Sequence, residues 1–299
     1  FTGMLESNGS VSTGQVFYKG TELTKLTTNS QWEKIRGAEI STIFQDPMTS
    51  LNPIKTIGSQ ISETIIKHQG KTKEEAKVIA IDLMDRVGIP EAAKRYDEYP
   101  FQYSGGMRQR IVIAIALSSR PKVLICDEPT TALDVTIQAQ IIALLKELKA
   151  EYGFAMIFIT HDLGVVASIA DKVAVMYSGE IIEYGTVEDI FYDSRHPYTW
   201  ALLSSLPQLA TTEKLYSIAG TPPSLYSEIK GDAFAPRNPS PMAVDFVEIP
   251  PKFPISDTHW AKTWLLDNRA PKLSKPEGIQ DLHAKMLKIY DKAGGVNLG

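Results

Sequence analysis

The stretch KVLICDEPTTALD, residues 122–134, decides the fold class, because it joins a buried strand to two adjacent carboxylates. VLIC and the later MIFI (156–159) are continuous apolar runs, which are typical of parallel strands covered on both faces. The first strand delivers Asp127 and Glu128 to its carboxyl end, where open α/β sheets place their ligands. One carboxylate can hold Mg²⁺ through water while the next polarises an attacking water, as phosphoryl transfer requires. A solvated turn whose acids do no chemistry explains the same residues, so this stretch alone leaves both interpretations open.

Around this stretch, short β-rich runs alternate with helical ones, which predicts an α/β sheet layered by helices. We expect strands at residues 15–20, 40–45, 122–127, 155–160, 172–177 and 180–185. From residue 57 to about 119 the pattern is helical, beginning with a helix over IGSQISETIIKHQ (57–69), so a helical insert is expected inside the α/β core. Within the insert, Thr72 and Glu75 form a capping box at the start of a second helix, and Gly88 with Pro90 ends this second helix.

The composition changes after about residue 195. HPYTWALLSSLP predicts a short helix, and the proline-rich segments that follow favour turns and short edge strands. The tail from Pro276 to Tyr290 returns to helical spacing. Residues 195–299 are therefore expected to form a small separate domain or appendage.

The composition and charge are those of an ordinary soluble globular protein, with 43% hydrophobic and 22% charged residues. A net charge of −4 provides no basic excess for nucleic acid. A single cysteine, Cys126, excludes an internal disulfide and fits a reducing cytosol. The longest strongly apolar helical run, residues 111–117, is far shorter than the ~20 residues that span a bilayer. These features predict a soluble, intracellular protein.

Polar side chains end two further expected strands. His161 follows the apolar IFIT, and Gln45 follows ISTIF just before the helical insert. Each alone fits an ordinary hydrogen-bonded residue at a strand end. Because parallel strands end at the same edge of a sheet, the three strand ends together indicate a ligand site.

A glycine pair opens the helix predicted in YSGGMRQRIVIAIAL, residues 103–117. The unpaired amides and the dipole of a helix N-terminus favour an anion, and Ser104, Gly105 and Gly106 would let it approach closely. A serine N-cap on a flexible loop explains the same residues. No phosphate-binding loop of the GxxxxGK[ST] type occurs in the 299 residues, so the sequence leaves open whose ligand this helix would bind.

In this order and spacing, the motifs resemble those of the ATP-binding cassette (ABC) ATPases over roughly residues 1–190. The resemblance implies an α/β fold with an ABC-type, RecA-like nucleotide-binding core at 1–194. It also implies a helical subdomain at about 52–120 and a small Pro-rich C-terminal extension at 195–299. By resemblance, the functional residues are the Q-loop Gln45, the signature residues Ser104, Gly105 and Gly106, the Walker B pair Asp127 and Glu128, the D-loop Asp134 and the switch histidine His161.

Four segments are similar to the ATP-binding subunits of oligopeptide and dipeptide importers of Gram-positive bacteria: FQDPMTSLNP (44–53), YPFQYSGGMRQR (99–110), CDEPTTALDVTIQAQI (126–141) and RHPYTWALLSSLP (195–207). The resemblance implies an ATPase that couples ATP hydrolysis to oligopeptide import, with ATP and Mg²⁺ as cofactors.

The resemblance also assigns roles at the site. Glu128 would polarise the attacking water and His161 would contact the γ-phosphate, while Asp127 and Gln45 would bind Mg²⁺. The signature residues and Asp134 would close over the nucleotide of a partner subunit.

The partners implied by the resemblance are a second, paralogous ATP-binding subunit and membrane-spanning permease subunits, with an extracellular peptide-binding protein involved indirectly. The permease is expected to dock around residues 52–70, which places the protein peripherally at the cytoplasmic face of the cell membrane. Nucleic acid is not an expected partner. Two alternatives are a non-transport ABC ATPase acting on DNA or ribosomes, and a non-catalytic ABC partner subunit.

The sequence departs from the family pattern in two places. The chain starts at Phe1 without the phosphate loop (Walker A), and FTGMLES looks like the end of the helix that follows this loop in the family. We therefore expect an N-terminally truncated chain, which alone neither binds ATP tightly nor folds robustly.

The second departure concerns the extension, where some relatives carry four cysteines that hold an iron–sulfur cluster. The corresponding residues here are Asp232, Asn238, Asp245 and Thr263. No iron–sulfur cluster is therefore expected, and the role of the extension is predicted to be structural or contact-based.

Overall fold

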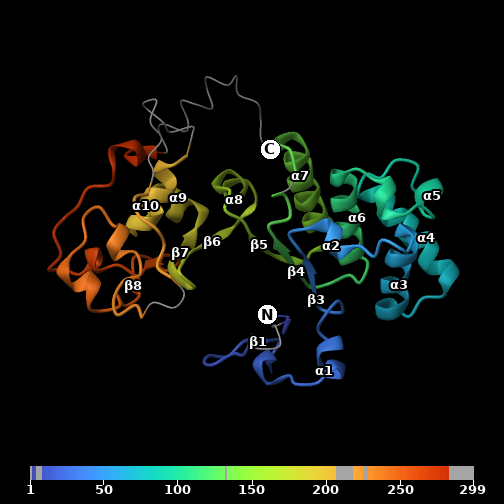
Figure 1. Cartoon of the computed structure of the whole chain (residues 1–299), viewed down its shortest axis with the longest axis horizontal. Coiled ribbons are helices and arrows are strands. Elements are labelled where there is room, and N and C mark those ends of the chain that lie inside the picture. The colour runs from blue at the N-terminus through green and yellow to red at the C-terminus, as the bar shows by residue number, and fades with distance from the viewer. Residues whose placement is uncertain (1, 5–8, 132, 207–217, 225–227, 283–299) are drawn as a thin grey trace. The chain divides into compact units, whose positions relative to one another are not determined.

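The structure is a computed structural model that describes residues 2–4, 9–131, 133–206, 218–224 and 228–282. The chain forms two compact units, Phe1–His161 and Asp162–Gly299, each of which is described by itself (Figure 1).

The first unit is built on a parallel sheet of β3 (Ile40–Ile43), β4 (Val123–Asp127) and β5 (Ala155–Ile159), in that order. The long helix α7 (Val135–Tyr152) connects β4 to β5, as a parallel pair requires. The register pairs Ile43 with Cys126, and Asp127 with Ile159. The three strands therefore end at a common edge, as the sequence predicts.

The two central apolar runs differ in how they are covered. In β4, Leu124 and Cys126 are fully buried, which confirms the prediction for VLIC. For MIFI in β5 the prediction is wrong, because Ile157 and Ile159 are 38% and 48% exposed. Successive strand residues point to opposite faces, and in the described part of the chain this face of β5 is open to solvent.

The helical insert contains α2 (Pro47–Ser50), α3 (Ile57–Gln69), α4 (Lys73–Arg86), α5 (Ala92–Arg95), the 3₁₀ turn η2 (Pro100–Gln102) and α6 (Gly105–Leu117). Helix α6 contacts both β3 and the α3–α4 pair, and so joins the insert to the sheet (Figure 1). Helix α3 has the predicted bounds, and its inner face carries Ile57, Ile61 and Ile65, each fully buried.

The capping box predicted at the start of α4 is present. The Thr72 hydroxyl accepts from the amide of Glu75 at 3.2 Å, and the Glu75 carboxylate accepts from the amide of Thr72 at 2.9 Å. Gly88 follows the helix with φ +81°, a left-handed conformation that glycine adopts without strain.

The N-terminal segment forms a small hairpin of β1 (Phe17–Tyr18) and β2 (Thr21–Glu22), followed by η1 (Leu23–Lys25) and α1 (Asn29–Glu33). The strand predicted at 15–20 therefore ends early, because Lys19 and Gly20 form the turn with positive φ. Of the stretch FTGMLES, the structure describes residues 2–4, which have no regular secondary structure.

The second unit contains an antiparallel sheet with the strand order β6 (Lys172–Tyr177), β7 (Glu180–Thr186), β9 (Trp260–Ala261) and β8 (Phe253–Pro254). Its helices are α8 (Leu163–Ile169), α9 (Val187–Asp193) and α10 (Pro197–Ser204). Strand β9 pairs with β7, so the proline-rich extension continues the sheet that β6 and β7 begin. This division at residue 161 differs from the domain boundary expected at residue 194.

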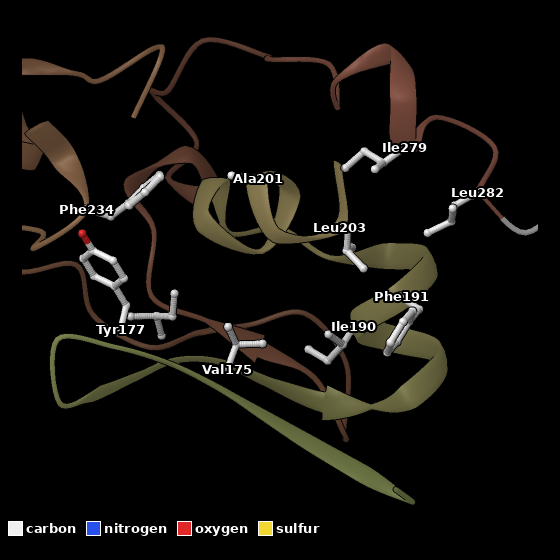
Figure 2. Close-up of a cluster of buried hydrophobic side chains, with 10 residues drawn as sticks. Val175, Tyr177, Ile190, Phe191, Ala201, Leu203, Phe234, Ile279 and Leu282 are labelled. Atoms are coloured by element: carbon white, nitrogen blue, oxygen red, sulfur yellow. The ribbon is translucent and has the colours of Figure 1, made fainter. Parts of the chain in front are cut away.

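A hydrophobic core holds the second unit together. Figure 2 shows Val175 and Tyr177 of β6 pointing toward the side of the sheet where α10 and Phe234 lie. The rings of Tyr177 and Phe234 meet edge to face with centroids 5.4 Å apart, and Tyr198 lies 5.3 Å from Phe234. Such aromatic packing buries a large apolar area and stabilises the unit by the hydrophobic effect.

The other described elements of the extension are short turns, as its prolines predict: η4 (Ala235–Arg237), η5 (Ala243–Phe246), η6 (Trp264–Leu266) and η7 (Glu277–Ile279). Of the helical tail predicted at 276–290, the described part reaches residue 282 and contains η7, while the remainder lies outside the described residues. No helix in the described ranges is both long enough and apolar enough to cross a membrane.

Candidate active site

The backbone turns Glu128 away from the sheet directly after β4. Its φ of +44° lies in the left-handed region, which is unusual for a residue other than glycine and is common at functional sites. Its amide donates a hydrogen bond of 3.0 Å to the carbonyl of Ile159, the last residue of β5. The residue is therefore fixed across two strand ends while its side chain stays partly accessible.

Three side chains contact the Glu128 carboxylate. The Thr131 hydroxyl donates to Oε2 at 2.7 Å, and the Gln45 amide donates to the same oxygen at 3.4 Å. Nδ1 of His161 lies 3.1 Å from Oε1. The structure thus brings Gln45, Glu128 and His161 together, three residues that come from the ends of β3, β4 and β5.

The surroundings of Glu128 favour its charged form. The hydrogen bond from Thr131, and next the one from His161, holds the pKa of Glu128 below its usual range, while partial burial acts in the opposite direction. The carboxylate is therefore ionised at neutral pH. An ionised, oriented carboxylate beside a strand end can align and polarise a water molecule.

Asp127 is the last residue of β4, and its side chain is half-buried next to Glu128. Within the part of the chain that the structure describes, no group of three or more His, Cys, Asp or Glu is placed to hold a metal. Mg²⁺ usually keeps several waters and takes one or two carboxylates together with substrate phosphates. Asp127 and Glu128 are carboxylates of the kind that would fit such a hydrated Mg²⁺.

The signature residues form the N-terminus of α6. The Ser104 hydroxyl caps the helix by accepting from the amide of Met107 at 3.4 Å. A Cβ added at Gly105 would meet no heavy atom within 4 Å among the described residues, so the approach to the helix start is open. A Cβ at Gly106 would lie 2.8 Å from Cγ2 of Ile137 in α7, so this glycine permits the two helices to pack closely.

Asp134 begins α7, and its Oδ1 accepts from the amide of Ile137 at 3.0 Å. Arg110 of α6 donates to the carbonyl of Val87 at 2.6 Å and to the side chain of Gln140 at 3.2 Å. The starts of α6 and α7 are therefore fastened to each other. The side chains of Ser104 and Asp134 make these capping hydrogen bonds within their own helices and not with Glu128. The predicted site residues therefore fall into two groups, one around Glu128 and one at the starts of α6 and α7.

Thr131 also contacts Glu128 at this site, but it was not predicted from the sequence. The signal was its place three residues after Glu128 in a tight turn, where the Thr131 amide donates to the Glu128 carbonyl at 3.3 Å. Such a turn brings the first and fourth side chains close together.

Comparison with known proteins identifies the family. Residues 2–131 match the ABC transporter family, and residues 182–243 match the C-terminal region of oligopeptide and dipeptide transporters. The oligopeptide transport ATP-binding protein AmiE of Streptococcus pneumoniae is 68% identical over 299 residues, which are all of this chain and 83% of that protein. This chain belongs to the oligopeptide and dipeptide transport ATP-binding proteins of the ABC family.

Other members of this ABC family support the same conclusion. The oligopeptide transport ATP-binding protein OppD of Bacillus subtilis is 52% identical over 281 residues, 93% of this chain and 78% of that protein. The dipeptide transport ATP-binding protein DppD of Lactococcus lactis is 56% identical over 279 residues, 93% of this chain and 80% of that protein.

Solved structures agree with the fold of the ABC family. The dimeric ATP-binding cassette MJ0796 bound to ADP and phosphate superimposes with a TM-score of 0.53 at 28% identity, over 60% of this chain and 75% of that one. CbiO1 from Clostridium perfringens, part of an ABC transporter complex, superimposes with a TM-score of 0.55 at 29% identity, over 64% of this chain and 71% of that one. The ABC-type α/β fold predicted from the sequence is confirmed, as is membership of the ABC ATPase class.

Proposed function

We propose that this ABC subunit hydrolyses ATP at an interface with a second ATP-binding subunit and that hydrolysis drives oligopeptide import across the cell membrane. The observation that carries the proposal is the convergence of Gln45 and His161 on the Glu128 carboxylate. The peptide substrate is supported by the names of the relatives, which are oligopeptide and dipeptide transport proteins.

Glu128 orients and polarises the attacking water, for which its ionised carboxylate is suited. His161, whose Nδ1 contacts Glu128, contacts the γ-phosphate. Asp127 and Gln45 would hold a hydrated Mg²⁺, which would neutralise charge on the transferred phosphate. Gln45 lies next to Asp46, the N-cap of α2, and so connects the strand end to the helical insert.

Ser104, Gly105 and Gly106 contact the ATP carried by the partner subunit through the free amides at the start of α6, and Asp134 faces the same interface. The open approach at Gly105 supports this assignment. A dimeric relative is found among the solved structures. The second subunit is a paralogue of this chain, and neither nucleic acid nor an iron–sulfur cluster belongs to the proposal.

The permease subunits dock at the helical insert around residues 52–70, on the cytoplasmic face of the membrane. Apolar side chains of this segment are exposed, with Ile54 at 83% and Ile66 at 37%. Exposed apolar groups of this kind mark interaction surfaces. The extracellular peptide-binding protein acts through the permease and not through this subunit.

The test is steady-state ATP hydrolysis and peptide uptake by the assembled transporter carrying Glu128→Gln. We expect both rates to fall by roughly 10²- to 10³-fold with ATP binding retained, since general-base groups contribute at this scale. A matched control is Glu91→Gln, an exposed glutamate that also has a positive φ. Unchanged hydrolysis in Glu128→Gln would contradict the assignment.

A further inference from the structure

The shortest contact of the Glu128 carboxylate is with a residue that carries no role in the proposed function. The Thr131 hydroxyl lies 2.7 Å from Oε2 of Glu128, whereas the Gln45 amide lies 3.4 Å from the same oxygen. Nδ1 of His161 lies 3.1 Å from Oε1. Hydrogen bonds to a charged acceptor are the strong ones, and 2.7 Å is the usual length for a hydroxyl donor.

The backbone holds Thr131 in this place. The Thr131 amide donates to the carbonyl of Glu128, and the Leu133 amide donates to the carbonyl of Thr130 at 3.1 Å, so two successive turns follow β4. Threonine is branched at Cβ, which restricts the rotamers of its hydroxyl. The donor is thus preorganised relative to the strand end.

We propose that Thr131 is a positioning residue that holds the Glu128 carboxylate in the orientation needed to polarise the attacking water. The inference rests on the proposed function, and it adds to that function a residue that acts only through Glu128.

The geometry also assigns the two carboxylate oxygens. Each oxygen of a carboxylate has about two acceptor positions. Oε2 accepts from Thr131 and Gln45 and is filled, whereas among the described residues Oε1 contacts His161 alone. The water therefore binds to Oε1 of Glu128, beside the histidine that faces the γ-phosphate. Without Thr131 the carboxylate can rotate, and Oε2 competes for the same water.

The experiment measures ATP hydrolysis by the assembled transporter with Thr131→Val and Thr131→Ser. Valine keeps the shape and lacks the hydroxyl, and serine restores the donor. We expect kcat to fall roughly threefold to tenfold in Thr131→Val with KM for ATP unchanged, because only a group acting on the base is lost. Thr131→Ser should recover most of the rate.

The matched control is Thr24→Val. The Thr24 hydroxyl also donates to a glutamate, Glu22, at 2.9 Å, but this pair lies in η1 and β2 of the N-terminal segment. We expect no change in kcat for Thr24→Val. Thermal unfolding of each variant shows that it is folded.

The decisive arm is a double-mutant cycle in single-turnover hydrolysis. If Thr131 acts through Glu128, Thr131→Val has no further effect in a Glu128→Gln background. An unchanged kcat in Thr131→Val, or an equal loss in both backgrounds, would overturn the positioning role while leaving the proposed function intact. Full hydrolysis by Glu128→Gln alone would instead overturn the proposed function and, with it, this inference.

Discussion

Two clusters of polar side chains in this subunit differ mainly in burial. The cluster at the end of the parallel sheet is open, with the side chain of His161 71% and that of Glu128 26% exposed. The cluster in the second unit is closed, since Glu183 and His196 are 0% and His259 is 1% exposed. Both contain a glutamate bonded to a histidine, at 3.1 Å and 3.0 Å. The same pair of residue types therefore lies open at a strand end, where the proposed function assigns it to hydrolysis, and closed inside a core, where it joins segments of the fold.

The closed cluster fastens segments that are far apart in the sequence. The Glu183 carboxylate accepts from the amide of Arg195 at 2.5 Å, from the amide of His196 at 3.2 Å and from Nε2 of His259 at 3.0 Å. It thereby ties β7 to the start of α10 and to the residue before β9. A buried carboxylate is stable only when its acceptor positions are filled in this way.

The four residues that the resemblance sets at the positions of the cluster cysteines are also buried in the second unit. Each is at most 9% exposed, and each side chain accepts a backbone amide: Asp232 from Phe234, Asn238 from Ser240, Asp245 from Met242 and Thr263 from Leu265. Short polar side chains of this type stabilise turns. We propose that these local hydrogen bonds hold the loops of the extension in place.

The largest expected effect concerns Glu183→Ala. The substitution leaves two amides and one ring nitrogen without their acceptor in the core, so the free energy of unfolding should fall by about 3 kcal/mol or more. The control is Glu180→Ala, whose exposed ion pair with Lys262 should contribute less than about 1 kcal/mol. Urea unfolding measures both variants, and equal losses would remove the distinction between closed and open polar groups.

The next effect is a pH dependence with opposite signs at His196 and Asp232, whose Nε2 and Oδ2 lie 3.8 Å apart. Burial lowers the pKa of His196 to about 3 and raises the pKa of Asp232 to about 6. Buried, neutral His196 makes its full contribution to the free energy of unfolding above the pKa of an unfolded histidine, about 6.5. This contribution is lost as the pH falls toward 3. That of Asp232 is complete below about 3.8 and is lost as the pH rises through 6.

Unfolding of His196→Asn and Asp232→Asn between pH 4 and 6.5 measures these contributions. Relative to wild type, Asp232→Asn should lose stability as the pH falls, and His196→Asn should gain it, each by about 1.4 kcal/mol per pH unit at most. Asparagine can keep both local acceptors, the one for Tyr198 and the one for Phe234. Parallel curves for the two variants would show that these groups do not titrate as buried residues.

The smallest expected effect separates the two signature glycines. Gly106→Ala forces a Cβ against Ile137, so overpacking should cost about 1–3 kcal/mol of unfolding free energy. Gly105→Ala enters open space and should leave stability within about 0.5 kcal/mol. If Gly105 faces the partner's nucleotide, hydrolysis by the assembled transporter should nevertheless fall in Gly105→Ala. Equal stability losses would indicate that both positions serve helix packing.

Much of the open region could be predicted from the sequence because its signals are local. Apolar runs gave β3, β4 and β5, helical spacing gave the bounds of α3, and Thr72 with Glu75 gave the start of α4. Motif order also brought Gln45, Glu128 and His161 to one edge. Each of these features depends on residues within a few positions of each other, or on the shared direction of parallel strands.

The closed region could not be predicted, because its contacts join distant residues. Nothing near Glu183 in the sequence indicates that His259 lies 3.0 Å away, or that β9 will pair with β7. The exposed face of β5 was missed for a similar reason, since an apolar run does not show which neighbours cover it. Thr131 was missed because a hydroxyl in a turn has many ordinary uses.

The most direct measurement compares Glu128→Gln with Glu183→Gln in the same two assays, urea unfolding of the protein and ATP hydrolysis per folded molecule by the assembled transporter. Glu128→Gln should lose hydrolysis by roughly 10²-fold or more while its unfolding free energy stays within about 0.5 kcal/mol of wild type. Glu183→Gln should lose unfolding free energy and keep its hydrolysis rate per folded molecule. A Glu128→Gln variant that unfolds more easily yet hydrolyses ATP at the wild-type rate would contradict the account.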